Sequence, residues 1–186
     1  MKTIYLFILF TVVALAQIYV PSQMILNRES ILKEGEVYKF RTQPIDPSDP
    51  FRGKYIALNY KITSYKTKDT LWERNEPIYV YLKKDSLGYA KIDKVIRNVD
   101  INSENDYVTA KVLWYSIYDQ QLTIEFPFNR YYMEESKAYD AEVAVRKTPN
   151  NTIKYSTYAV VHVKEGDAVL SDVLVNGIPI KDFVDK

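Results

Sequence analysis

The chain has 186 residues, 47% of them hydrophobic and 26% charged, so it can bury the core of one ordinary domain, and wholesale disorder is excluded. It carries 25 Lys and Arg against 24 Asp and Glu, and it therefore lacks the clustered basic excess of a nucleic-acid-binding protein. The absence of Cys excludes disulfides, thiolate metal sites and Cys nucleophiles.

The first part of the chain is apolar and almost uncharged. Residues 3–27 carry no charge, and the run 4–20 contains only Thr11 and Gln17 as non-aromatic polar residues. A transmembrane helix needs about 20 such residues. Lys2, together with the amino terminus, favours a cytoplasmic N-terminus. The pattern therefore predicts a membrane anchor that places the rest of the chain on the extracytoplasmic, periplasmic side.

A cleaved signal peptide is the alternative interpretation of this segment. Ala14-Leu15-Ala16 resembles the small-residue site at which such peptides are cut. The apolar character continues beyond that site, through Ile18 to Leu26, which favours an uncleaved anchor. Either outcome places the following domain outside the cytoplasm.

The apolar segment leads into a short stalk. Pro21 is expected to kink or restart the helix, and residues 22–33 have the spacing of an amphipathic helix up to Gly35, a helix stop. We therefore expect an anchor and stalk over residues 1–34 and an extracytoplasmic β domain over residues 35–186.

After Gly35 the apolar positions alternate, which is typical of strands. Ile56, Leu58 and Tyr60 fall on one face of a predicted strand that continues to Ile62. Asn176-Gly177 is a strong hairpin signal, and a short helix or turn is expected over residues 131–137. The other predicted strands are 37–42, 78–83, 89–95, 107–117, 122–126, 139–147, 157–163 and 168–175. The predicted fold is mainly β, an antiparallel sandwich or partly open barrel.

The most informative local feature is the segment 46–60. Asp46 and Asp49 precede prolines, and Arg52-Gly53 leads into the strand that starts near Tyr55. Asp-Pro pairs begin turns readily, so these residues can be read as turn caps with Gly53 at a bend. The other interpretation is a binding or catalytic edge at the strand entrance, because loops held by rigid strands are where functional sites concentrate.

Residues 53–60, Gly-Lys-Tyr-Ile-Ala-Leu-Asn-Tyr, resemble the signature of the GDYXXLXY family of bacterial proteins, and residues 44–53 resemble the lead-in to it. Lys54 departs from the signature, which has Asp there. The resemblance implies a membrane-anchored protein that is often encoded beside multi-span membrane proteins, without an established activity. Alternation along the strand assigns Leu58 and Tyr60 to the core and leaves Tyr55 on the other face as the candidate for function.

No other constellation favours catalysis. His162 is the single histidine and lies on a predicted strand, opposite to its apolar neighbours. The acidic residues Glu125, Glu134, Glu135 and Glu142 could supply a carboxylate pair for glycoside chemistry only at a separation that the sequence does not give. We therefore predict a non-enzymatic binding or accessory module for an integral membrane partner, without cofactor or metal. The alternative is a cell-envelope enzyme or a metal- or ligand-binding domain that uses Asp46, Asp49, Arg52 and Tyr55.

Overall fold

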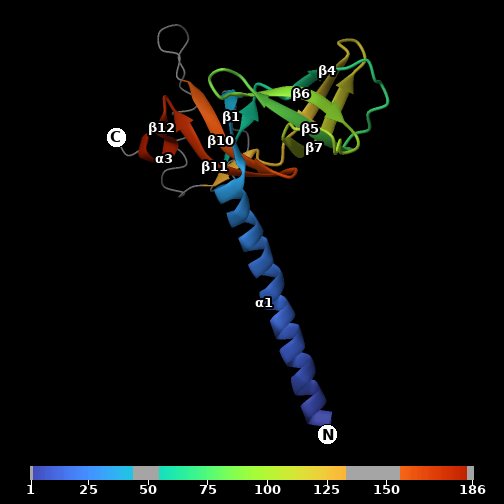
Figure 1. Ribbon diagram of the computed structural model, residues 1–186, viewed down its shortest axis with the longest axis vertical. Coiled ribbons are helices and arrows are strands. Elements are labelled where there is room, and N and C mark those ends of the chain that lie inside the picture. Colours follow the sequence, from blue (N-terminus) through green and yellow to red (C-terminus); the bar gives the residue numbers. More distant parts are fainter. Residues whose placement is uncertain (1, 44–54, 133–155, 184–186) are drawn as a thin grey trace.

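The computed structural model describes residues 2–43, 55–132 and 156–183. Its first element is one long helix, α1 (Lys2–Glu34), which projects away from the β part of the molecule with the N-terminus at its far end (Figure 1). The helix is long and apolar enough to cross a membrane, and none of its apolar span is buried. It continues through Pro21, so the predicted restart there does not occur. It ends at the predicted stop, where the Gly35 N–H donates to the Ile31 carbonyl over 2.9 Å.

Two five-stranded antiparallel sheets make up most of the β part. The first has the order β12-β11-β10-β1-β3 and the second the order β4-β8-β7-β5-β6. The first sheet consists of β1 (Glu36–Gln43), β3 (Asn59–Tyr60), β10 (Thr157–Lys164), β11 (Asp167–Val175) and β12 (Ile178–Pro179). The second consists of β4 (Ser64–Lys66), β5 (Pro77–Lys84), β6 (Ala90–Ile96), β7 (Tyr107–Ser116) and β8 (Gln121–Glu125). A two-stranded sheet pairs β2 (Tyr55–Ala57) with β9 (Arg130–Tyr132), and the short helix α3 (Ile180–Phe183) follows β12.

These strands confirm the predicted mainly β, antiparallel architecture. Of the predicted strands, 139–147 lies outside the described residues, and each of the others has a counterpart within a few residues. The hairpin predicted at Asn176-Gly177 joins β11 to β12, with positive φ angles of 53° and 83°. The same two-residue geometry joins β10 to β11 at Glu165-Gly166.

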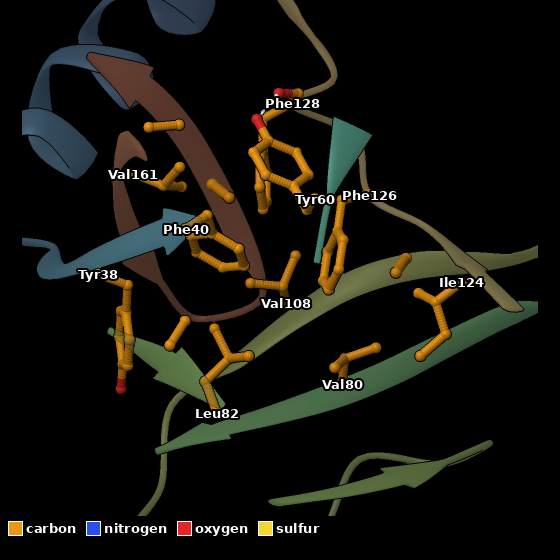
Figure 2. Close-up of a cluster of buried hydrophobic side chains, with 14 of the residues drawn as sticks. Tyr38, Phe40, Tyr60, Val80, Leu82, Val108, Ile124, Phe126, Phe128 and Val161 are labelled. Atoms are coloured by element: carbon orange, nitrogen blue, oxygen red, sulfur yellow. Dashed lines mark hydrogen bonds between the residues drawn. The ribbon is translucent and has the colours of Figure 1, made fainter. Parts of the chain in front are cut away.

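One hydrophobic core fills the space between the two large sheets. Alternate residues of β1 and β10 meet alternate residues of β5, β7 and β8 (Figure 2). Phe40 lies at the centre and makes edge-on contacts with Tyr60, Phe126 and Phe128 at ring-centroid distances of 5.5, 5.5 and 4.9 Å. Burial of this apolar area is the main stabilising contribution to the fold.

The structure also corrects two expectations about the strands. The strand predicted from Ile56 to Ile62 is interrupted at Leu58, because β2 pairs with β9 whereas β3 pairs with β1. The chain thus crosses from the small sheet to a large one at that residue. Tyr131 and Tyr132, expected in a short helix or turn, form part of β9 instead, since their backbone pairs with Ile56 and Tyr55.

The segments 69–76 and 98–106 contain no strand, but they are more than solvated connections. The Arg97 guanidinium stacks on the Trp72 ring at 3.9 Å, pairs with Asp69 and donates over 2.8 Å to Glu76. The second segment covers the fully buried Tyr81, whose hydroxyl accepts the Asp100 N–H over 2.8 Å. Both segments are therefore fixed to the second sheet.

Candidate functional site

The predicted functional edge falls largely outside the described residues. Asp46, Asp49, Arg52 and Gly53 are not among them, and of Tyr55 the backbone is described, where it opens β2 opposite Tyr132. A binding or catalytic role for this edge stays a prediction.

The two residues predicted to be structural are well defined. Leu58 and Tyr60 retain only 3% and 2% of their surface exposed, as the strand alternation predicts. The Tyr60 hydroxyl donates to the Phe128 carbonyl over 2.7 Å, and the Leu58 N–H donates to the Asn129 carbonyl over 2.8 Å. Burial raises the pKa of Tyr60 well above its usual range, so its phenol stays neutral and remains a hydrogen-bond donor.

These two hydrogen bonds fix the segment that connects β8 to β9. Pairing of Ala57 with Arg130 continues the same attachment into the small sheet. The motif strand therefore holds residues 126–130 in place from the core side (Figure 2).

The fixed segment forms one wall of a cleft of about 470 Å³, which we call the α1 cleft. It lies where the end of α1, the second sheet and the β10–β11 hairpin meet. Its described lining consists of Arg28, Pro77, Thr109, Ala110, Lys111, Glu125, Phe126, Pro127, Asn129, Arg130, Gly166, Asp167 and Ala168.

The β10–β11 hairpin closes another side of this cleft by docking on β7. The Thr109 N–H donates to the Gly166 carbonyl over 2.8 Å. Gly166 has a φ of 89°, and a Cβ there would lie 2.6 Å from Cε2 of Tyr107. Only glycine therefore fits this turn without displacing the tyrosine.

The end of α1 is attached to the same hairpin by an apolar contact and by polar ones. Ile31 is 2% exposed, and Arg28 Nη1 donates to the Ala168 carbonyl over 3.1 Å. Lys164 donates to Ser30 Oγ over 2.8 Å and to Glu34 Oε2 over 2.5 Å, which lowers the pKa of the Glu34 carboxyl. The helix thus has a defined orientation on the domain, and the α1 cleft lies beside its last turns.

The cleft brings together both signs of charge. Arg28, Lys111 and Arg130 supply cations, and Glu125 and Asp167 supply carboxylates. In the described part of the chain, no group of three His, Cys, Asp or Glu residues is placed to hold a metal ion. His162 lies apart, on the strand face opposite the buried Val161 and Val163, as predicted. The lining suits recognition of a polar, charged segment.

Sequence reasoning did not identify this cleft. Glu125 is one of the acidic residues considered above for a carboxylate pair, Arg28 falls within the predicted stalk, and Lys111 lies on a strand with no distinguishing motif. Two features of the sequence could have pointed to this cleft. Arg28 is the first charged residue after the apolar run, and Gly166 lies in a turn.

Comparison with known proteins agrees with the resemblance of residues 53–60 to the GDYXXLXY signature. The profile of the GDYXXLXY protein family matches residues 17–173, most of the chain. No curated protein and no solved structure matches this chain. The apolar helix α1 is a candidate membrane anchor and, with the family match, fits a membrane-anchored domain. The chain belongs to the GDYXXLXY family.

Proposed function

We propose that this protein is a membrane-anchored accessory module whose domain lies on the extracytoplasmic, periplasmic side and binds an integral membrane protein without catalysis. The observation that carries the proposal is the attachment of α1 to the β10–β11 hairpin through Arg28, Ile31 and Lys164. This attachment holds the α1 cleft beside the end of the apolar span.

The exposed side chains of α1 support an uncleaved anchor. Cleavage after Ala16 would leave a chain that begins with a helix exposing Ile18, Val20 and Ile25 to water, each more than half exposed. In a bilayer the same side chains are matched by lipid. Lys2 at the opposite end agrees with a cytoplasmic N-terminus.

The position of the α1 cleft, next to the membrane end of the apolar helix, suggests the class of partner. Arg28 lines the cleft and directly follows Asn27, the last residue of the uncharged segment. The polar loops of a multi-span protein leave the membrane at this level. With cations at Lys111 and Arg130 and carboxylates at Glu125 and Asp167, the cleft is complementary to a loop that carries both signs of charge.

Site-specific photo-crosslinking in native membranes tests this proposal. A photoreactive residue replaces Lys111 in the cleft or, as a matched control, the exposed Lys66 of β4, which lies at the far end of the second sheet from α1 (Figure 1). We expect an adduct with a multi-span membrane protein from position 111 and none from position 66. Identical adducts from both positions, or adducts with soluble proteins alone, would contradict it.

The non-enzymatic part has its own test. Asp49 belongs to the alternative catalytic edge predicted from the sequence. If the purified protein turned over an envelope substrate and Asp49→Ala abolished turnover without unfolding it, the non-enzymatic assignment would be wrong.

A further inference from the structure

Gln17 carries unused hydrogen-bonding groups in the apolar part of α1. Its carboxamide offers two donors and an acceptor and has no hydrogen-bond partner in the described residues. Thr11 and Ser22 differ, because their hydroxyls donate to the Phe7 and Ile18 carbonyls over 2.9 and 2.8 Å.

Pro21 adds a second unmet group at the same position. In an α-helix the carbonyl of residue 17 accepts from the N–H of residue 21, and proline has no N–H. Gln17 therefore lacks both a side-chain partner among the described residues and the regular helical N–H donor for its carbonyl.

These groups lie close to the centre of the span. The uncharged residues 3–27 centre on Leu15, and Gln17 is about 3 Å further along the axis at a rise of about 1.5 Å per residue. Lipid tails offer no hydrogen-bond partner at that depth. Backbone groups freed by proline in such helices are satisfied by neighbouring helices, by Ser or Thr side chains, by ordered water or by local changes of helix geometry.

We infer that α1 pairs in the membrane with α1 of a second copy of this chain, through the face that carries Gln17. Two copies inserted with the same topology are parallel, so each places its Gln17 at the same depth. A carboxamide is both donor and acceptor, so two Gln17 side chains complement each other across a two-fold axis. Each can also donate to the backbone carbonyl that Pro21 leaves free on the other helix.

The residues around Gln17 have the spacing of a parallel helix pair. Going along the helix, the intervals alternate between four and three residues, which is the seam of a left-handed coiled coil. The seam consists of Phe10, Ala14, Gln17, Pro21 and Met24. Ala14 is small and permits close approach beside Gln17. The pairing is independent of the partner proposed for the α1 cleft.

Disulfide cross-linking of the full-length chain in native membranes tests the inference. The chain has no Cys, so each introduced thiol is unique. Met24→Cys places the thiol on the Gln17 face, and Leu26→Cys places it about 200° around the helix at about 100° per residue. Both side chains are similarly exposed, at 66% and 62%, and both variants leave residues 14–16 unchanged.

We expect oxidation to give a dimer with Met24→Cys and little with Leu26→Cys. Adding Gln17→Leu to Met24→Cys should weaken association roughly 5- to 30-fold, and Gln17→Asn should restore part of it. Equal cross-linking at positions 24 and 26, or no effect of Gln17→Leu, would overturn the pairing. It would also be overturned by adducts of position 24 with a different protein alone, or by a mature chain that begins at Gln17.

Discussion

The Tyr60 hydroxyl donates a 2.7 Å hydrogen bond to the Phe128 backbone carbonyl, and so joins the family motif to the wall of the α1 cleft. The two residues are 68 positions apart in the chain, and their rings are in contact, with centroids 5.4 Å apart. The motif thus acts in this chain as a support for residues 126–130.

Removing this hydroxyl should destabilise the domain. Tyr60→Phe leaves the buried Phe128 carbonyl without its donor, which costs about 1–3 kcal/mol in the free energy of unfolding. Urea denaturation of the full chain in detergent, followed by circular dichroism, measures the loss. Tyr118→Phe is the matched control, because Tyr118 is 100% exposed and its variant should leave the free energy unchanged. A Tyr60→Phe chain as stable as the parent would show that the bond contributes nothing.

Stability should also fall at alkaline pH. Burial raises the pKa of both Tyr60 and Tyr38 above the usual range, and at Tyr38 the hydrogen bond to Asp106 adds to the effect. In the folded state the pKa of each tyrosine exceeds the unfolded value of about 10. The contribution of each neutral phenol to the free energy of unfolding is therefore complete below about pH 10 and is lost progressively as the pH rises above 10 towards the folded-state pKa. Above about pH 10, each of the two tyrosines lowers the free energy of unfolding by up to about 1.4 kcal/mol per pH unit. Unfolding free energies from about pH 8 to about pH 11 should show a steep decline that Tyr60→Phe makes shallower. An equal slope in both chains would contradict this origin.

The sequence predicted local features well and long-range ones poorly. Alternation predicts the strand around Val80, and Asn176-Gly177 predicts its hairpin, because each pattern depends on neighbours in the chain. The interruption at Leu58 depends on β9 and β1, which lie far away in the sequence, so no local pattern encodes it. The α1 cleft draws its lining from residues as distant as Arg28 and Ala168, and it becomes visible only once the sheets are assembled.

Truncating Ile31, the one buried side chain among the described residues of α1, should release the helix from the domain. Ile31→Ala removes a side chain that is 2% exposed, and such changes cost about 2–5 kcal/mol where no collapse fills the space. Ile31 lies outside the main core, so we expect undocking rather than global unfolding. Trypsin cleavage after Lys33 should become faster. Leu32→Ala is the control, since Leu32 is 40% exposed, and equal rates in the two variants would contradict the docking role.

The Arg97 guanidinium should determine the environment of Trp72. The side-chain hydrogen bond from Arg97, aided by the Leu71 N–H, lowers the pKa of Asp69 below its ordinary value of 3.8. The Arg97–Asp69 ion pair is therefore complete above about pH 3.8 and is lost as the pH falls through the lowered pKa of Asp69. In a Trp114→Phe background, Arg97→Ala should shift the emission of Trp72 to the red by exposing the ring. Arg97→Lys keeps the charge but loses the planar stacking and the bidentate geometry, so it should shift the emission nearly as far. Unchanged emission in both variants would exclude the stacking role.

The position of the domain relative to the membrane can be measured through introduced thiols, because the chain has no Cys. Tyr118→Cys puts a thiol on the exposed β7–β8 turn, and Thr3→Cys puts one at the opposite end of the molecule. With the N-terminus in the cytoplasm, a membrane-impermeant maleimide should label Tyr118→Cys in intact cells and Thr3→Cys only after the membrane is opened. Protection of Tyr118→Cys until lysis would place the domain in the cytoplasm. Label from Thr3→Cys on a chain of full length would exclude cleavage at Ala16, whereas a mature product without that thiol would identify the segment as a signal peptide.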